Sequence, residues 1–269
     1  MRVLITGASG GFGSELIKHL DSFDTISLRY NEIDRQRMLQ LSNCDVCIHC
    51  GALLSGDFND LLESNTLLTK IILDYINSAN PGAHFIYLGT MSVLKKKQNI
   101  LPDDYLNFQN MTDYALSKYM SEAICSRYRI PITIVRFSTL FRRNPTKDGL
   151  SKLVHDAVKN RKITIYNNGV AERDFLPLDI AAQYVVKLIG KEKCFGKTLN
   201  IVSGKETRFK DIADFLKIRV KDLIIENENV EAGGNVPSNF NCNDIRFLGE
   251  IKFDLFEKID KYIQELSGK

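Results

Sequence analysis

Between residues 5 and 13 the chain reads ITGASGGFG, and this glycine-rich segment restricts the choice of fold more than any other feature. It follows the apolar run Val3–Ile5, which predicts a short buried strand, and precedes a stretch whose apolar residues recur at helical spacing. A strand, a glycine turn and a helix in this order bring backbone N–H groups against a phosphate. Gly7 permits the tight turn, Gly10 allows close approach of a pyrophosphate, and Gly13 lets the helix pack near the strand. The segment therefore predicts a dinucleotide-binding turn.

Strands and helices alternate along the first half of the chain, and their order predicts the fold. Strand-like apolar runs cover residues 24–29, 46–50, 84–88 and 132–137, and helical periodicity covers residues 60–77 and 113–128. This alternation predicts an α/β fold with a Rossmann-type, doubly wound parallel sheet. Ligands of such sheets bind at the carboxyl ends of the strands. The residues expected to bind the cofactor there are Thr6, Gly7, Ser9, Gly10, Gly11, Phe12, Gly13, Gly51 and Ala52.

The rest of the chain predicts a second, smaller unit. We expect residues 1–138 and about 173–202 to form the dinucleotide-binding domain. Residues of about 139–172 and 203–269 would then form a small, mainly C-terminal substrate-binding domain. A helix over residues 179–188 is expected to return to the main sheet, residues 231–237 to form a loop, and residues 255–266 to form an amphipathic helix.

Composition excludes several classes of protein. The chain has 269 residues, 44% of them hydrophobic and 26% charged, as in an ordinary soluble globular protein. A net charge of +3 gives no reason to expect nucleic acid as a partner. No apolar run is long enough to span a membrane or to form the core of a signal peptide, so we expect a cytoplasmic protein without a membrane partner.

Three cysteines, Cys44, Cys47 and Cys50, have a spacing that could suggest a metal site. The segment that contains them has the apolar character of a buried strand, on which side chains three residues apart point to opposite faces. Three sulfur atoms placed in this way do not converge on one ion. We therefore predict no metal site.

Arg29 stands at the end of the second predicted strand, about twenty residues after the first glycine. In an NAD-binding unit this position carries an acid that binds the ribose 2′-hydroxyl. A cation would instead attract the 2′-phosphate of NADP, so NADP(H) is favoured as the cofactor and NAD(H) is kept as the alternative. Two other interpretations stay open: Arg29 faces solvent while Glu32 or Asp34 takes the role of the acid, or Arg35 or Arg37 holds the phosphate. Asp34 is also the expected N-cap of a short helix.

Tyr114 and Lys118 are four residues apart in a predicted helix, so both side chains lie on one face. A lysine ammonium beside a phenol favours the phenolate and lowers the pKa of the tyrosine, which suits it for acid–base catalysis near neutral pH. Thr90, at the end of a neighbouring strand, could donate a hydrogen bond to a substrate carbonyl. These three residues are the candidate catalytic group.

Taken together, these segments resemble the short-chain dehydrogenase/reductase family, in its extended branch of nucleotide-sugar epimerases, dehydratases and reductases. The resemblance runs from Met1 to about Ile201. Its segments are the glycine turn, the strand Asp45–Ala52 with Asn65 after it, the pair Tyr114 and Lys118 continuing to Glu122, the strand end Arg136–Ser138 and the segment Arg173–Asp179. By this resemblance Thr90 is the catalytic hydroxyl residue, with Ser92 as its substitute, and Tyr114 and Lys118 also bind the cofactor.

The resemblance also implies where a nucleotide-sugar substrate would bind. Arg173 would face its diphosphate, and Thr139 stands where many members have an asparagine near the substrate phosphate. Arg142 and its neighbour Arg143 either clamp an anionic substrate or are solvated. Many relatives form homodimers through the two long helices, so a homodimer is the expected assembly.

Three functions remain open on these grounds. The first is NADP-dependent reduction of a nucleotide-linked 4-keto-6-deoxy sugar, which the short chain and Arg29 favour. The second is a nucleotide-sugar 4-epimerase with tightly bound NAD. The third is a non-catalytic NADP sensor on the same fold, which the intact set of Thr90, Tyr114 and Lys118 disfavours.

Overall fold

The computed structural model describes residues 1–34, 36, 38, 41, 43–94, 101, 102, 104, 106, 111–230 and 243–268. Arg35, Arg37 and the predicted loop over residues 231–237 lie outside these ranges, as does part of the short helix expected after Asp34. In the described part of that helix, the N–H of Met38 donates to the carbonyl of Asp34 at 3.0 Å.

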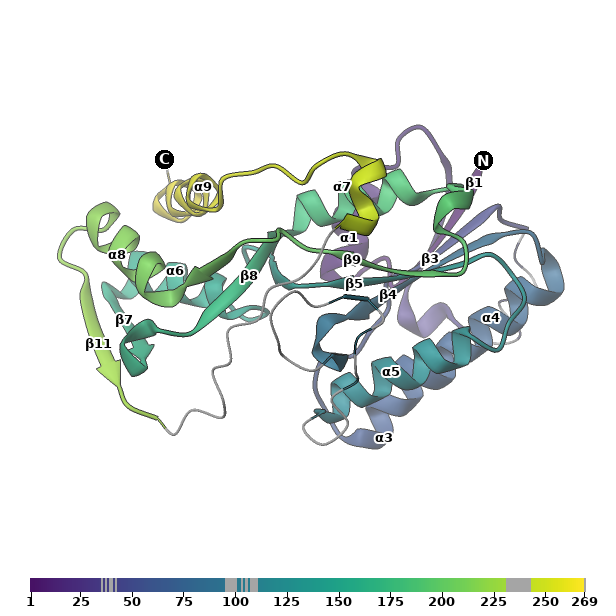
Figure 1. The fold of residues 1–269 in the computed structure, drawn as a ribbon, viewed down its shortest axis with the longest axis horizontal. Helices are drawn as coiled ribbons and strands as arrows, with labels where there is room; N and C mark the ends of the chain where they lie inside the picture. Colours follow the sequence, from purple (N-terminus) through teal and green to yellow (C-terminus); the bar gives the residue numbers. More distant parts are fainter. Residues whose placement is uncertain are drawn as a thin grey trace.

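A six-stranded parallel sheet forms the larger lobe, as Figure 1 shows on the right. Its order is β2-β1-β3-β4-β5-β9, and the strands are β1 (Arg2–Thr6), β2 (Asp24–Leu28), β3 (Val46–His49), β4 (His84–Thr90), β5 (Ile132–Phe137) and β9 (Lys197–Ile201). The chain starts in β1, next to the edge of the sheet, adds β2 at that edge and then crosses back over β1 to β3, which creates a topological switch point beside the glycine turn. The predicted Rossmann-type fold is confirmed.

Helices cover both faces of this sheet (Figure 1). On one face lie α1 (Gly11–Ile17) and α7 (Leu178–Leu188), and on the other lie α3 (Phe58–Leu61), α4 (Leu68–Ala79) and α5 (Asp113–Cys125). Two separate apolar clusters fill the layers, one around Ile5 and Ile48 and one around Leu4 and Phe85. Alternate residues of a strand point to opposite faces, which explains why each central strand supplies both clusters.

The predicted helix over residues 60–77 is one continuous run with an irregular middle. Residues Leu62–Leu67 (η2) form a π-helical segment between α3 and α4. Asn65, Thr66 and Ser64 are buried in it. Since the carbonyl of Asn65 accepts hydrogen bonds from the hydroxyls of Thr69 (2.5 Å) and Ser121 (2.8 Å), side chains stabilise this irregular turn.

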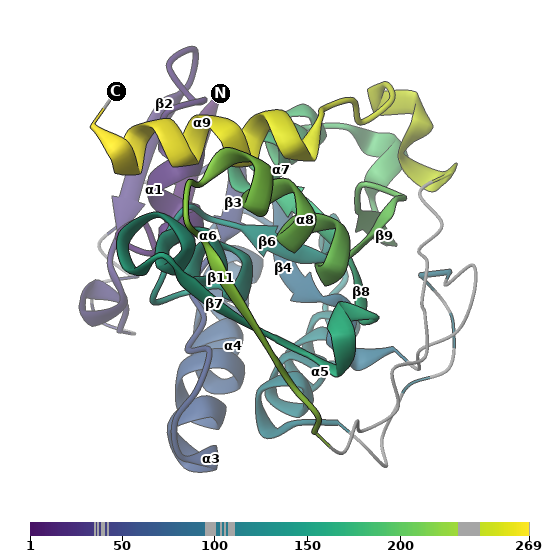
Figure 2. The ribbon, with the colours of Figure 1, turned by 90° about the vertical axis from the view of Figure 1, so that its left-hand side faces the viewer.

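The smaller lobe is seen on the left of Figure 1 and facing the viewer in Figure 2. Its strands are β6 (Thr139–Phe141), β8 (Glu172–Pro177) and β10 (Glu206–Arg208) in one sheet, and β7 (Lys162–Tyr166) and β11 (Ile224–Glu228) in another. Its helices are α6 (Gly149–Asn160), α8 (Phe209–Arg219) and α9 (Leu255–Ser267), and Figure 2 shows α9 lying across α6 and α8. A third apolar cluster, which includes Phe141, Leu216 and Tyr262, joins these elements.

Short 3₁₀ turns connect several of these elements. They are η1 (Tyr30–Glu32), η3 (Met91–Val93), η5 (Asn167–Gly169), η6 (Glu192–Cys194) and η7 (Asn243–Leu248).

The pairing of strand β8 bears on where the boundary between the two predicted domains lies. Residues 173–177 were expected in the dinucleotide-binding domain, but β8 pairs with β6 and β10 in the smaller lobe. The following helix α7 packs against α1 and the main sheet, as expected. We therefore propose a boundary nearer residue 178, with β9 returning to the larger lobe.

Asp174 is buried where the chain passes between the two sheets. Its carboxylate accepts hydrogen bonds from the hydroxyl of Ser138 (2.6 Å) and from the backbone N–H groups of Ser203 (3.0 Å) and Gly204 (2.7 Å). Burial raises the pKa of Asp174, while these three donors act in the opposite direction. One carboxylate thus joins the end of β5, the strand β8 and the end of β9.

The three cysteines near β3 lie on two sides of the main sheet. Cys44 and Cys47 pack in the cluster beneath α4 and α5, whereas Cys50 packs against the cluster beneath α1 and α7. Burial raises the pKa of the Cys44 thiol to about 11, which is unfavourable for the thiolate that a metal requires.

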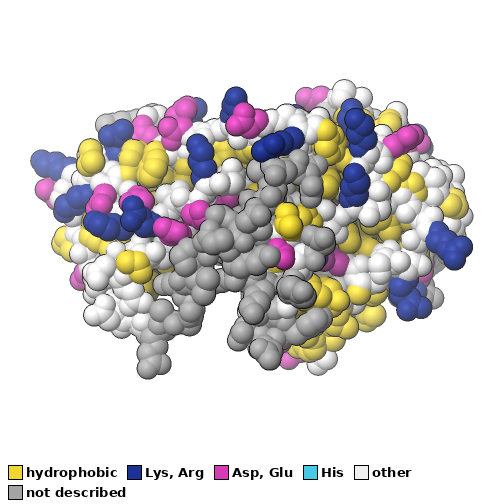
Figure 3. All heavy atoms as spheres, in the orientation of Figure 1, with side chains coloured by type: hydrophobic (Ala, Val, Ile, Leu, Met, Phe, Trp, Pro, Cys, Tyr) yellow, Lys and Arg dark blue, Asp and Glu magenta, His cyan; other side chains and the backbone are white. Residues whose placement is uncertain are grey.

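Charges of both signs are mixed on the surface. In Figure 3, Lys and Arg side chains stand among Asp and Glu side chains on both lobes of the face shown. Within the described residues, no helix combines the length and the apolar character needed to cross a membrane.

Candidate active site

The glycine turn has the tight geometry that its sequence predicts. Gly7 has a φ of 75°, and a Cβ atom at this position would lie 2.4 Å from the backbone nitrogen of Gly51. A Cβ atom on Gly13 would lie 2.3 Å from the carbonyl oxygen of Gly7. Side chains at these two positions would therefore separate β1 from β3 and α1 from the turn. The role of Gly10 toward a pyrophosphate stays a prediction.

The outer part of the glycine turn is exposed and carries no large side chain. Ser9, Gly10 and Gly11 are exposed, while Phe12 turns inward, with its ring centroid 5.1 Å from that of Phe137. The N–H of Ala8 donates to the carbonyl of Leu28 at 3.1 Å, which fixes the turn beside the end of β2. A short backbone turn without large side chains, placed at a switch point, fits the diphosphate of a dinucleotide.

Behind the turn, buried hydrogen bonds link β1 to the π-helical segment. Thr69 donates its hydroxyl proton to the carbonyl of Asn65, so its oxygen accepts from Nε2 of His49 at 3.0 Å. Nδ1 of His49 then accepts from the hydroxyl of Thr6 at 2.6 Å. Burial, together with the nearby cation of Lys118, lowers the pKa of His49 to about 3, which keeps the imidazole neutral. His49 therefore supports the turn structurally and holds a fixed tautomer.

The side chain of Asn65 connects the loop after β3 to α5, the helix that carries the candidate catalytic pair Tyr114 and Lys118. Its side chain accepts from the N–H of Leu53 at 2.7 Å and donates to the hydroxyl of Ser117 at 2.9 Å. Ser117 in turn donates to the carbonyl of Tyr114 at 2.8 Å. The sequence had indicated Asn65 but gave no signal for Ser117 or Thr69, whose roles depend on the three-dimensional contact between α5 and the π-helical segment.

Lys118 is almost completely buried, with 2% of its surface exposed. Its Nζ lies 4.3 Å from the ring centroid of Tyr87 on β4, and its charge acts on His49 and Cys50 at the end of β3. Burial lowers the pKa of Lys118 to about 8, although the carboxylate of Glu122 acts in the opposite direction. The ammonium therefore stands at the carboxyl ends of β3 and β4, and Tyr87 is a neighbour that the sequence did not reveal.

Tyr114 is one helical turn away and half-buried. Burial raises its pKa, and the cation that acts in the opposite direction is the guanidinium of Arg142. The expectation that Lys118 is the cation that lowers the pKa of Tyr114 is therefore not met in the structure. The physical reason is that Lys118 points inward toward Tyr87, whereas Arg142 approaches the phenol from the smaller lobe.

Thr90 ends strand β4 and caps the short turn η3. Its hydroxyl accepts from the N–H of Ser92 and lies 3.2 Å from the hydroxyl of Ser92, to which it donates. Thr90 is half-buried and Ser92 is exposed. Both candidate hydroxyls are therefore at the carboxyl edge of the sheet, on the strand whose Tyr87 contacts Lys118.

A buried ion pair between β5 and α5 lies next to this edge of the sheet. Arg136 of β5 donates from Nε and Nη2 to the two carboxylate oxygens of Glu122 on α5, at 3.1 and 2.6 Å. The forked pair passes close to Gly89, where a Cβ atom would lie 2.5 Å from Glu122 Oε1. Glu122 and Arg136, two of the residues on which the family resemblance rests, thus bind each other. Their ion pair fixes α5 to the sheet next to Thr90.

Arg29 follows β2 directly and is exposed. Its backbone N–H donates to the carboxylate of Glu32 at 2.7 Å, so one oxygen of Glu32 is engaged in closing this turn. The structure places Arg29 beside the glycine turn, because the N–H of Ala8 binds the neighbouring carbonyl of Leu28. Asp34 is exposed further along, and Ala52 is exposed at the end of β3.

The predicted substrate residues divide into groups. Thr139 begins β6 opposite Phe175, and Arg173 lies on β8 with its Nη1 donating to the carbonyl of Glu172 at 2.7 Å. Arg143 forms an ion pair with Glu265 of α9. Arg142 instead reaches the glycine turn, since its Nη1 lies 4.0 Å from the position of a Cβ atom on Gly11.

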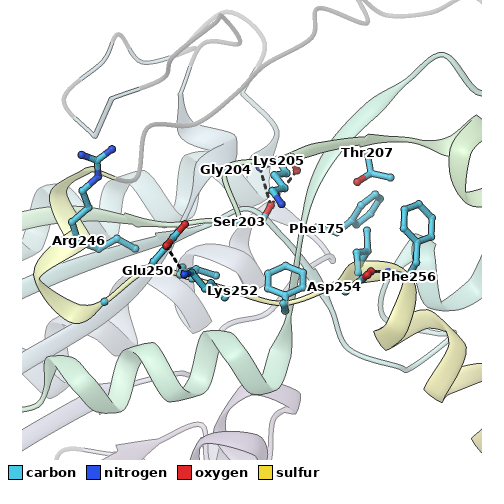
Figure 4. Close-up of a pocket in the computed structure, with 15 residues that line it drawn as sticks. Phe175, Ser203, Gly204, Lys205, Thr207, Arg246, Glu250, Lys252, Asp254 and Phe256 are labelled. Carbon is cyan, nitrogen blue, oxygen red and sulfur yellow. Dashed lines mark hydrogen bonds and ion pairs between the residues drawn. The ribbon is translucent and has the colours of Figure 1, made fainter.

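A cavity of about 1300 Å³ lies beside Phe175 and Thr207, the strand partners of Thr139 and Arg173 (Figure 4). It is lined by the loop after β9, by Phe175 and by the segment between η7 and α9, including Ser203, Lys205, Arg246 and Phe256. Its lining shares no residue with the glycine turn or with Thr90, Tyr114 and Lys118. The candidate site is therefore defined by the carboxyl edge of the sheet and not by this cavity.

The fold and this site together define the class of the protein, a dinucleotide-binding enzyme of the short-chain dehydrogenase/reductase type. The model of the NAD dependent epimerase/dehydratase family matches residues 3–201. The chain belongs to that family.

Known proteins of similar sequence and fold agree with this assignment. An uncharacterized UDP-glucose epimerase of Bacillus subtilis (strain 168), YtcB, is 23% identical over 243 residues, which cover 75% of this chain and 76% of that protein. The structure of a UDP-glucuronic acid 4-epimerase from Bacillus cereus in complex with NAD superposes with a TM-score of 0.81 at 19% identity, covering 98% of this chain and 97% of that chain. A UDP-glucose 4-epimerase from Thermotoga maritima with UDP-glucose gives a TM-score of 0.84 at 16% identity, covering 100% and 99%.

Proposed function

We propose that the protein is a nucleotide-sugar 4-epimerase that uses a nicotinamide dinucleotide. The observation that supports this proposal is the position of Lys118 at the carboxyl ends of β3 and β4, near Tyr87 and Cys50. Tyr114 is one helical turn from Lys118, and Thr90 ends β4. The family is that of NAD dependent epimerases and dehydratases, and the similar proteins named above are described as epimerases of UDP-linked sugars. The reductase that the short chain and Arg29 favour is kept as the second candidate.

Different residues of the chain would bind the cofactor and transfer the proton. The exposed backbone of residues 9–11 and the ammonium of Lys118 would hold the cofactor at its diphosphate and at its nicotinamide ribose. A bound nicotinamide would supply reversible hydride transfer at the reacting carbon of the sugar. Tyr114, as the phenolate that the charge of Arg142 favours against its burial, would accept the proton of the reacting hydroxyl and give it back. The hydroxyl of Thr90 would donate a hydrogen bond to the oxygen on which charge develops.

The experiment compares two kinds of redox balance. Purified protein is incubated with NAD⁺ and, in turn, UDP-glucose, UDP-glucuronic acid and UDP-N-acetylglucosamine, and the sugar products are separated by chromatography. An epimerase converts a sugar into its 4-epimer with no net formation of NADH, because the hydride is returned. Stoichiometric consumption of NADPH with a 4-keto sugar would instead identify a reductase. Cofactor binding without turnover of any substrate would identify a sensor.

A second candidate, the NADP-dependent reduction of a 4-keto sugar, is favoured by one observation. Arg29 stands beside the glycine turn at the position where an NAD-binding unit has an acid, and its side chain is exposed. A guanidinium at this position suits a 2′-phosphate better than a free ribose hydroxyl. The same residue therefore decides between the two cofactors.

We expect Arg29→Asp to shift cofactor preference from NADPH toward NADH by about ten- to a hundredfold, the worth of one charge-assisted hydrogen bond. The carboxylate repels the phosphate and accepts a hydrogen bond from the free 2′-hydroxyl. The measurement is the ratio of dissociation constants for NADPH and NADH at fixed salt, with the exposed Arg129→Asp as the control for net charge. An unchanged ratio contradicts the role of Arg29, and a wild-type preference for NADH removes the NADP assignment.

The expected homodimer stays a prediction, since it was inferred from resemblance alone. It would use the outer surfaces of α4 and α5.

A further inference from the structure

Two adjacent arginines, Arg142 and Arg143, follow strand β6 and point in different directions. The backbone of this corner is held by Asp148, the N-cap residue of α6, whose carboxylate accepts from the N–H of Arg142 at 3.0 Å and from the N–H of Ser151 at 2.7 Å. Arg143 has a φ of 54°, so the chain reverses sharply there. The turn therefore separates two side chains that are neighbours in the sequence.

Arg143 belongs to the outer surface of the smaller lobe. Its guanidinium forms an ion pair with Glu265 near the end of α9. This contact turns Arg143 toward α9, whereas Arg142 reaches the glycine turn. Arg143 is therefore a matched control for Arg142: it has the same side chain and the adjacent position, but a different neighbourhood.

Arg142 bridges the two lobes at the candidate active site. Its Nη1 lies 4.0 Å from where a Cβ atom on Gly11 would stand, so the guanidinium is placed against the outer part of the glycine turn. The same guanidinium acts electrostatically on the pKa of Tyr114, against the effect of burial. A cation between these two residues occupies the space along which an extended dinucleotide would pass from its diphosphate to its nicotinamide.

We propose that Arg142 is a cofactor-binding residue, which holds the diphosphate of the dinucleotide from the side of the smaller lobe. This inference rests on the proposed use of a nicotinamide dinucleotide and adds a ligand to it. The glycine turn supplies neutral backbone donors, and a guanidinium adds a full charge and a fork of two N–H groups that matches phosphate oxygens. The sequence had placed Arg142 with the substrate, but the approach of its guanidinium to the open side of Gly11 favours a place at the cofactor.

Binding measured by calorimetry tests this without any need for turnover. The probes are ADP-ribose, which carries the cofactor diphosphate without nicotinamide, and UDP, which carries the diphosphate of a UDP-linked sugar. We expect Arg142→Met to weaken ADP-ribose binding about ten- to a hundredfold and to leave UDP binding within about twofold. Arg143→Met should leave the affinity for both probes unchanged.

A third variant and a salt series make the result decisive. Arg142→Lys keeps the charge and loses the fork, so its affinity for ADP-ribose should fall between wild type and Arg142→Met. The wild-type affinity for ADP-ribose should fall more steeply with salt than that of Arg142→Met. Loss of UDP binding with intact ADP-ribose binding would assign Arg142 to the substrate and overturn the inference, as would unchanged binding of both. Wild-type protein that binds neither ADP-ribose nor NAD⁺ would overturn the proposed function itself.

Discussion

Tyr114→Phe should lower turnover by about 10²–10⁴, the usual contribution of a positioned acid–base group, and leave the fold intact. The change removes one hydroxyl from a half-buried ring on α5 and leaves the ring itself in place. Turnover is measured at saturating substrate, once the first substrate has been found in the product assay. A variant with nearly wild-type turnover would exclude Tyr114 as the proton-transfer residue.

Tyr128→Phe is the matched control, and it should give the opposite result. The hydroxyl of Tyr128, just beyond the other end of α5, donates to the carboxylate of Asp74 at 2.6 Å. Its loss should cost about 1 kcal/mol of unfolding free energy and leave turnover unchanged. Urea unfolding of both variants separates an effect on chemistry from an effect on stability.

Lys118→Met should abolish activity and at the same time make the cofactor-free protein more stable at pH 7. Burial lowers the pKa of Lys118 from 10.5 to about 8, so keeping this buried side chain charged at pH 7 costs on the order of 3 kcal/mol. Methionine removes that cost and keeps a contact with the ring of Tyr87 through its sulfur. We expect a gain of about 1–3 kcal/mol in unfolding free energy, together with weaker cofactor binding.

The pH dependence gives this prediction a definite sign. Between about pH 8 and pH 10.5 the unfolded chain holds a proton on Lys118 that the folded chain has lost, so the wild-type protein gains stability from this group as pH rises. The advantage of Lys118→Met should therefore shrink over that range. Urea unfolding at pH 7 and pH 10 measures it, with the exposed Lys70→Met on α4 as the control. A variant less stable than wild type at pH 7 would contradict the assignment of Lys118 as a destabilising buried charge.

Local sequence patterns predicted most of the architecture. The glycine turn, the strand periodicities and the alternation with helices are properties of short segments. They predicted five strands of the main sheet and the helices on its two faces, but they did not mark β9 as the sixth strand. The π-helical segment around Asn65 has no such local signal. It depends on the hydroxyls of Thr69 and Ser121, which both donate to the backbone carbonyl of Asn65. Ser121 is 56 residues from Asn65 in the sequence.

The sequence indicated which residues belong to the candidate site, but it did not indicate where their side chains point. Tyr114 and Lys118 share a helix face, as their spacing requires, but spacing does not say that Lys118 turns inward to Tyr87. The difference between Arg142 and Arg143 depends on a positive φ angle and on a cap from Asp148, neither of which the sequence marks. The pairing of β8 with β6 and β10 is likewise a long-range choice.

The position of Asp174 has a mechanical consequence. Its carboxylate is bonded to the chain at Ser138, Ser203 and Gly204, which are the points where β5 and β9 leave the main sheet for the smaller one. Sliding of one lobe over the other would break these three bonds together, whereas rotation about the carboxylate would preserve them. We therefore expect any movement of one lobe relative to the other to be a rotation about Asp174, which would carry Arg142 toward or away from Gly11.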